Sequence, residues 1–299
     1  MKRSQVLALA GIALLGFALP RAAFPTVSAA AFPVLSPQGD KKEADASAKK
    51  TPPADDPKVA ELLKALKKVV KGKATEDSEG ARVLDELASK FDALNTKQQK
   101  AVADGVGDAF GARRKSDEVV LYLSAGEALS RFGGLGASEL AKVVDDRRFK
   151  KQDWSTMRAQ LVRLLGRPAD KRYVDLLLDI ALKDNDDQAR AKAGEALGNY
   201  ARFDQGLRKD IFEKLVKSLE ESYAKSKENL DPNNLEREMW VQRYAAIQDP
   251  WMKTLGRLTG QSIKDVQEWT KWWNENKSSN WDKEGFRTEA PKDGDSKKS

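Results

Sequence analysis

The acidic run Asp184-Asn185-Asp186-Asp187 is the most prominent cluster of metal-ligand types in the sequence. Read as a calcium loop, it would place Asp186 at the third position and Glu195 at the last, but the glycine that such a loop needs at its sixth position is Ala189 here. Aspartates are equally suited to accept hydrogen bonds from the first amides of a helix. We therefore expect helix caps, and we predict no metal and no other cofactor.

Histidine and cysteine are both absent from the 299-residue sequence. Their absence excludes Ser-His and Cys-His nucleophiles, thiol redox chemistry and conventional zinc sites in this chain. An enzyme would have to use carboxylates, for example two acids about 5–10 Å apart acting on cell-wall glycan. Because the acids occur mostly at predicted helix starts and on polar faces, we expect a non-catalytic protein. The carboxylate enzyme or glycan-binding module stays as an alternative.

Five of the seven tryptophans lie within residues 240–273, at Trp240, Trp251, Trp269, Trp272 and Trp273. The last three share one face of a predicted helix, because they are spaced by three and four residues. They could form an aromatic platform for a glycan or peptide. They could also cover the end of a stack of helices, which needs such a seal. Trp272 and Trp273 are therefore candidate partner-binding residues.

Apolar residues recur at helical spacing through the central region, and no alternating strand pattern is present. The sequence therefore predicts an all-α fold. Asp153, Asp170 and Asp186 or Asp187 are expected to cap helices, and Gly133-Gly134 to end one. Asp231-Pro232 and Asp249-Pro250 are each expected to start a helix. The predicted helices are about 59–70, 78–94, 96–110, 116–132, 137–145, 154–166, 171–183, 187–200, 207–225, 232–248, 250–258 and 263–276.

A repeated pentapeptide indicates how these helices are organised. Ala125-Gly126-Glu127-Ala128-Leu129 recurs 68 residues later as Ala193-Gly194-Glu195-Ala196-Leu197. A degenerate copy that begins at Arg158 aligns with Arg190 at an offset of 32. Such spacings on a helical pattern are typical of helix pairs stacked into a solenoid. Alanine and glycine at 191–194 would let two helices approach closely.

Each unit combines an acidic turn, an arginine, small residues and Leu-Gly. The matching residues are Asp187, Arg190, Ala193 and Leu197-Gly198, and one unit earlier Asp153, Arg158, Leu161 and Leu165-Gly166. Over about 116–225 the chain resembles the HEAT-repeat superfamily. The resemblance implies a right-handed α-solenoid of antiparallel helix pairs.

A second resemblance concerns the C-terminal end. Leu258-Thr259-Gly260-Gln261 followed by Trp269-Thr270-Lys271-Trp272-Trp273 is similar to the closing segment of exported bacterial HEAT-repeat proteins. It implies a terminal helical cap, at about 240–276, on a secreted solenoid that spans 57–276. It carries over no catalytic residue.

Both ends of the sequence differ from its centre. Residues 1–31 combine Lys2 and Arg3 with an apolar run and small residues, which is typical of a secretory signal peptide. Residues 32–56 are predicted to be a disordered linker, and 277–299 a disordered charged tail in which Trp281 and Phe286 could dock. We expect an exported protein, periplasmic or extracellular, with no transmembrane segment in the mature chain. An uncleaved N-terminal anchor is the alternative.

The favoured function is a non-catalytic scaffold that binds a protein partner of unknown identity through its solenoid surface. Exposed basic residues on 171–183 and 207–225 are expected to make the contact, namely Lys171, Arg172, Arg208 and Lys209. Nucleic acid is not expected, because loss of three signal-peptide cations lowers the formal charge from +7 to about +4. Cell-wall or lipid contact through the lysines of the first helix stays open.

Overall fold

The computed structural model describes residues 54–228 and 235–283. In these residues the chain forms eleven α-helices and no strand, so the all-α prediction is confirmed for this part of the chain. None of the described helices has the length and apolarity that crossing a membrane requires. The predicted signal peptide, linker residues 32–53 and Asp231-Pro232 lie outside the described residues. The helices are α1 (Pro57–Lys71), α2 (Asp77–Lys90), α3 (Thr96–Gly107), α4 (Val120–Ser130), α5 (Gly133–Asp145), α6 (Ser155–Leu165), α7 (Val174–Lys183), α8 (Asp187–Leu197), α9 (Gln205–Lys227), α10 (Leu235–Thr259) and α11 (Val266–Asn276).

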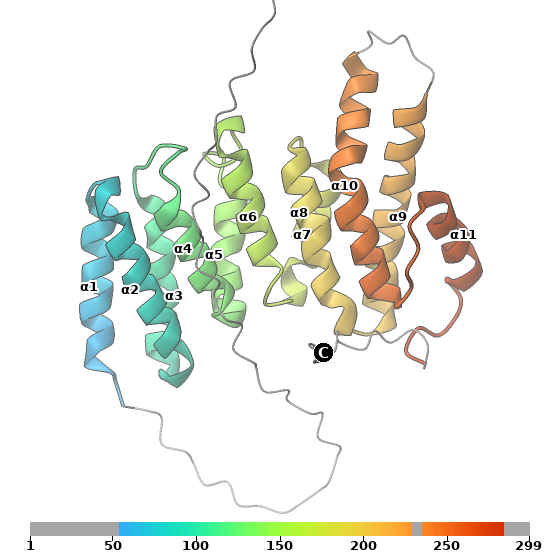
Figure 1. Ribbon diagram of the computed structural model, residues 1–299. Coiled ribbons are helices and arrows are strands. Elements are labelled where there is room, and N and C mark those ends of the chain that lie inside the picture. The colour runs from blue at the N-terminus through green and yellow to red at the C-terminus, as the bar shows by residue number, and fades with distance from the viewer. Residues whose placement is uncertain (1–53, 229–234, 284–299) are drawn as a thin grey trace, which may run out of the picture. The chain divides into compact units, whose positions relative to one another are not determined.

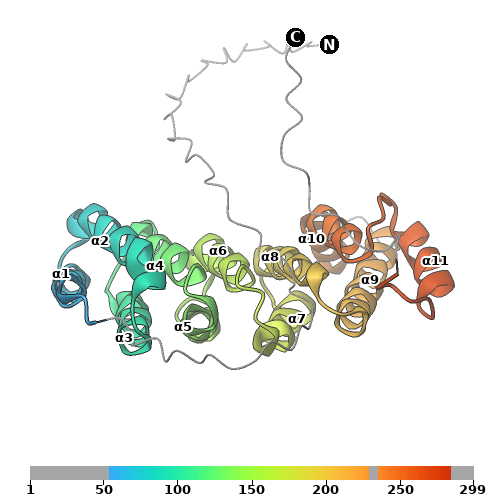
Figure 2. The same ribbon diagram turned by 90° about the horizontal axis from the view of Figure 1, so that it is seen from below.

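The helices pack in two layers (Figures 1 and 2). In one layer α2, α4, α6, α8 and α10 follow one another, each in contact with the next. In the other, α1 contacts α3, α3 contacts α5, α7 contacts α9, and α9 contacts α11. Apolar faces from both layers form one hydrophobic core that extends from Val59 to Trp281. Each amphipathic helix is thus stabilised mainly by neighbours that cover its apolar face.

Small residues of the repeated sequence lie where neighbouring helices of one layer meet. A Cβ atom on Gly126 of α4 would lie 2.6 Å from a Leu161 methyl group of α6. Gly166, after α6, lies directly against Ala196 of α8, and Gly194 of α8 lies against the ring of Trp251 on α10. The expectation that glycine and alanine permit close approach of helices is confirmed at these positions.

Two of the predicted helix caps are present. The Asp170 carboxylate accepts a hydrogen bond from the Arg172 amide (3.0 Å) and caps the 3-10 turn that leads into α7. The Asp186 carboxylate accepts one from the Gln188 amide (2.9 Å) at the start of α8. The prediction for Asp153 is wrong, because this residue lies within a 3-10 turn and α6 begins without a side-chain cap.

The predicted break at Asp249-Pro250 is also wrong, because α10 continues through Pro250. Proline inside a helix removes one backbone hydrogen bond and costs about 3 kcal/mol or more. Burial of Trp251 and Leu255 in the core, where α10 packs on α8 and α9, offsets this cost. Gly133 likewise does not end a helix. With φ of 55° it begins α5, two residues after the Arg131 cap of α4.

The two arginines that the repeat aligns differ in their surroundings. Arg158 is buried, donates to the Val144 carbonyl (3.0 Å) and forms two hydrogen bonds with the Asp184 carboxylate, at 2.6 and 3.1 Å. Arg190 is buried as well, but no carboxylate of the described residues lies within ion-pair distance of it. Asp184 follows the end of α7, whereas the position 32 residues later lies inside the longer α9. The ion pair between Arg158 and Asp184 therefore has no counterpart at Arg190, because α9 occupies the equivalent position.

Because of the Arg158–Asp184 ion pair, we expect the stability of the fold to depend on pH. Burial raises the pKa of Asp184, but hydrogen bonds from Arg158 and the Asp186 amide, with the charge of Arg158, outweigh it and hold the pKa below its usual 3.8. A carboxyl with a lower pKa when folded stabilises the fold above its unfolded pKa, and this contribution is lost as the pH falls through the folded pKa.

We expect Asp184→Asn to lower the free energy of unfolding by about 2 kcal/mol near neutral pH, because the buried arginine loses its counter-charge. The difference from the unsubstituted protein should shrink once the pH falls below 3.8. Urea unfolding of both proteins at about pH 7, 5 and 3 measures it. A difference that stays constant over this range would show that the ionised carboxylate does not stabilise the fold. The exposed Asp179→Asn on α7 is the control.

Candidate functional site

The acidic run at 184–187 is used entirely in packing the helices. Asp184 binds Arg158, and Asp186 caps α8. Asp187 accepts a hydrogen bond from Arg243 of α10 at 2.8 Å. Within 54–228 and 235–283, no three acidic side chains are grouped so that they could hold a metal ion. The run therefore offers no site for a ligand.

The tryptophans of α11 surround Phe212 of α9. The ring centroids of Trp269, Trp272 and Trp273 lie 5.6, 5.5 and 5.3 Å from that of Phe212. Trp281, in the segment that we expected to be a disordered tail, lies at 5.5 Å and is fully buried. Trp273 is buried and Trp272 half-buried. This burial favours the seal over the aromatic platform, because most of the ring surface is already covered.

The expected exposure of Arg208 is wrong. Its side chain is 2% exposed and donates to the carbonyls of Leu258 (3.0 Å) and Trp281 (2.7 Å) and to the Asp282 carboxylate (2.7 Å). Lys209 donates to the Ser279 carbonyl at 2.7 Å. The cause in both cases is the segment 277–283, which folds back over the start of α9. The sequence does not indicate this contact.

Lys171 and Arg172 are exposed, as expected, at the turn before α7. Lys171 forms an ion pair with Asp204 (3.1 Å), and Arg172 forms one with Asp170 (2.6 Å). The six candidate residues thus fall into two groups. Arg208, Lys209, Trp272 and Trp273 gather near Trp281, whereas Lys171 and Arg172 lie at the start of α7.

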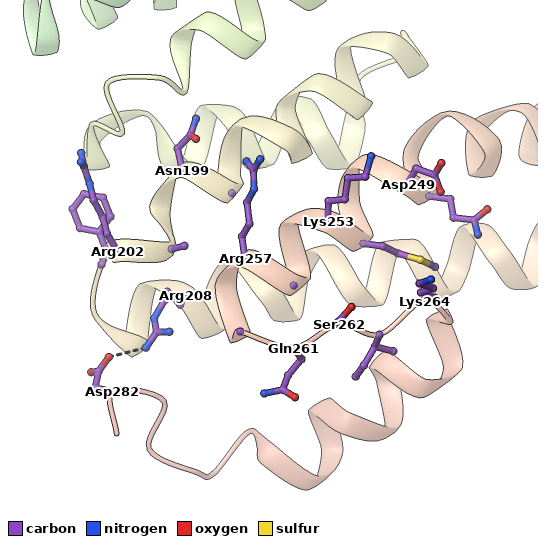
Figure 3. A pocket seen from close by; sticks show the side chains of 18 of the residues that line it. Asn199, Arg202, Arg208, Asp249, Lys253, Arg257, Gln261, Ser262, Lys264 and Asp282 are labelled. Carbon is purple, nitrogen blue, oxygen red and sulfur yellow. Dashed lines mark hydrogen bonds and ion pairs between the residues drawn. The ribbon is translucent and has the colours of Figure 1, made fainter. Parts of the chain in front are cut away.

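A wide, open groove of about 1610 Å³ lies beside the first group and includes Arg208 in its lining (Figure 3). Its walls are the 3-10 turn Gly198–Arg202 (η6), the start of α9, the C-terminal half of α10 and the segment 260–264. Three glycines, Gly198, Gly256 and Gly260, are among the lining residues. The lining residues are Gly198, Asn199, Ala201, Arg202, Phe203, Asp204, Arg208, Gln248, Asp249, Met252, Lys253, Gly256, Arg257, Gly260, Gln261, Ser262, Ile263, Lys264 and Asp282.

The charges in the groove are not balanced. Five cationic side chains line it against three carboxylates. Of the carboxylates, Asp282 binds Arg208 and Asp204 binds Lys171. The Leu207 amide and then Lys171 hold the pKa of Asp204 below its usual value, so this group is ionised. In the described part of the chain, four of the five cations have no carboxylate within ion-pair distance, namely Arg202, Lys253, Arg257 and Lys264.

Helix geometry positions these cations. Lys253 and Arg257 are four residues apart, so they share one face of α10, and in Figure 3 their side chains point to the same side of the groove. Arg257 lies across η6, where a Cβ atom on Gly198 would be 3.2 Å from its Cδ. Gly260, with φ of 75°, ends α10 and turns the chain into 261–264, which carries Lys264. Glycine is favoured there because other residues rarely adopt a positive φ.

The arrangement of cations can hold anions. A general acid needs a carboxyl with a raised pKa. Every described carboxyl whose pKa departs from its ordinary value is shifted downward, by hydrogen bonds and neighbouring cations. The groove is therefore a candidate binding site.

Sequence reasoning did not identify the four groove cations that have no carboxylate partner among the described residues. A signal exists for two of them, since Lys253 and Arg257 form an uncompensated pair of like charges at helical spacing. Arg202 and Lys264 carry no such signal, because they join the groove only through the packing of η6 and 260–264 on α10.

Comparisons with known proteins add no family or relative to this geometry. No protein-family model, no curated protein and no solved structure matches the chain.

Proposed function

We propose that this protein is a non-catalytic, exported helical scaffold that binds a protein partner in the groove between η6 and α10. The observation that carries the proposal is a set of four cations around an open groove, none of which has a carboxylate partner among residues 54–228 and 235–283. An exposed cluster of like charges opposes folding slightly and contributes nothing to the core. Binding an anionic group of a partner would turn this repulsion into attraction.

The scaffold is of the HEAT-like solenoid type in this proposal. Successive helices of one layer meet at equivalent small residues, Gly126, Gly166 and Gly194, as stacked repeats require. The aromatic cluster around Phe212 supports a terminal cap, since the last unit of a stack has no neighbour to cover its apolar face. In this proposal, the stacked helices hold the groove in place.

Two other functions have less support. An enzyme acting on glycan through paired carboxylates needs two acids that face each other in a cleft. In the groove, Asp204 and Asp282 are each bound to a cation already. Nucleic-acid binding favours a continuous basic surface, whereas this groove also exposes Asp249 and apolar side chains.

Site-specific photo-crosslinking in the native organism tests the proposal. Benzoylphenylalanine replaces Arg257 or Lys253 in the groove, and Lys64 or Lys68 on α1 as controls. Both pairs are exposed and spaced by four residues on a helix. We expect a discrete protein adduct from the groove positions alone. Adducts from neither pair would overturn the scaffold proposal, and adducts from α1 alone would remove the groove from it.

A further inference from the structure

We propose that the groove takes an extended, acidic peptide segment of the partner protein. This inference rests on the proposed function and adds the chemistry of the ligand. Three properties of the groove support it: cations that have no carboxylate partner among the described residues, the size of the groove, and the apolar and amide groups that lie among the charges.

The positions of the groove cations favour a ligand that carries carboxylates at more than one place. Lys253 and Arg257 project from one face of α10, Arg202 lies on η6, and Lys264 lies on the segment after α10 (Figure 3). Like charges four residues apart on a helix repel each other. A ligand carboxylate between them would remove the repulsion and form charge-assisted hydrogen bonds, which are about twice as strong as neutral ones. Cations on three different elements suit acidic side chains spaced along a chain.

The size of the groove favours a chain over a small molecule. Pockets for small ligands enclose about 300–1,000 Å³ and bury most of the ligand. This groove measures about 1610 Å³ and is open to solvent along its length. A small dicarboxylate would contact only one part of it, whereas an extended peptide can follow the wall from η6 to Lys264.

The groups between the cations favour a peptide over other polyanions. Phe203, Met252 and Ile263 give the lining apolar patches, which apolar side chains of a peptide can cover. The side-chain amides of Gln248 and Gln261 make no hydrogen bond within 54–228 and 235–283, so they are available to a peptide backbone. Asp249 would repel a phosphate or a carboxylate placed beside it, but it can accept a hydrogen bond from a peptide N–H.

Binding of defined peptides to the purified protein tests this inference. The probe is a fluorescein-labelled peptide of three Glu-Ala-Glu-Leu repeats, and its counterpart has glutamine in place of every glutamate. Fluorescence anisotropy gives the affinity of each. We expect the glutamate peptide to bind at least about tenfold more tightly than the glutamine peptide, because only the former supplies carboxylates.

A matched pair of double variants separates the groove from general attraction by a basic protein. Lys253→Glu with Arg257→Glu should weaken binding of the glutamate peptide by about tenfold or more. Lys64→Glu with Lys68→Glu makes the same change of charge at the same spacing on α1, and it should change the affinity by less than about twofold. Circular dichroism of both variants shows that each stays folded.

Three results would overturn the inference: equal binding of the two peptides, equal loss of affinity in both double variants, or binding of phosphatidylglycerol vesicles through Lys253 and Arg257 with none of the peptide. If the peptides fail to bind while crosslinking at Arg257 captures a protein, the ligand chemistry is wrong and the scaffold stands. If crosslinking fails as well, both proposals fall.

Discussion

Replacing Trp281 by alanine should lower the free energy of unfolding by about 3–5 kcal/mol, as truncation of a fully buried aromatic side chain does. Its ring is completely covered and lies within 5.9 Å, between ring centroids, of Phe212, Trp272 and Trp273. Its Nε1 also donates to the Asn276 carbonyl at 3.0 Å. Alanine leaves a cavity and removes one of two hydrogen bonds that the Asn276 carbonyl accepts, the other coming from the Ser279 amide at 3.0 Å. Urea unfolding followed by far-ultraviolet circular dichroism measures the loss.

Two further variants separate the contribution of the Trp281 ring from that of the whole segment 277–283. Trp281→Phe keeps an apolar ring and should lose about half as much stability as alanine. A chain shortened to end at Asn276 should lose at least as much as Trp281→Ala, because it also removes the Trp281 carbonyl and the Asp282 carboxylate that bind Arg208. If the shortened chain unfolds at the same urea concentration as the full chain, the segment 277–283 is not part of the fold.

The helices could be predicted because their information is local. A stripe of apolar residues, such as Val59, Leu62 and Leu66, identifies α1, although the helix begins at Pro57, two residues before the predicted start. Pro250 shows where local information fails. An isolated helix would break there, but the contacts of Trp251 with α8 keep α10 continuous. Tertiary packing therefore keeps α10 continuous through Pro250, although the local sequence predicts a break there.

The groove could be predicted much less well, because it is assembled from segments distant in sequence. Arg208 looks exposed in the sequence, on the polar side of a helix start, yet residues 281 and 282 cover it. Arg202 and Lys264, by contrast, carry no signal of their own and become neighbours of one groove when η6 and the segment 260–264 pack on α10. The sequence thus shows which residues are basic, but it does not show which of them lack a carboxylate partner among the described residues of the fold.

The close contact between α8 and α10 leads to the second large effect, which concerns Gly194. The ring of Trp251 occupies the space where a Cβ atom would stand, and its Nε1 donates to the Arg190 carbonyl at 3.2 Å. Thr254, one turn later, donates to the Gly194 carbonyl at 2.8 Å. Any side chain at 194 must therefore push α10 away from α8.

We expect Gly194→Val to lower the free energy of unfolding by about 3 kcal/mol or more, because overpacking this contact also strains both hydrogen bonds. Trp251→Ala alone should cost about 3–5 kcal/mol through the cavity it leaves. The double variant should be more stable than the sum of the two losses predicts, since valine would then occupy part of that cavity. Urea unfolding of the four proteins gives this coupling energy. Gly111→Val is the control, because open space surrounds a Cβ atom there.

Strictly additive losses at 194 and 251 would mean that Trp251 does not require a glycine at position 194. The repeated Ala-Gly-Glu-Ala-Leu sequence would then need an explanation other than the close approach of neighbouring helices.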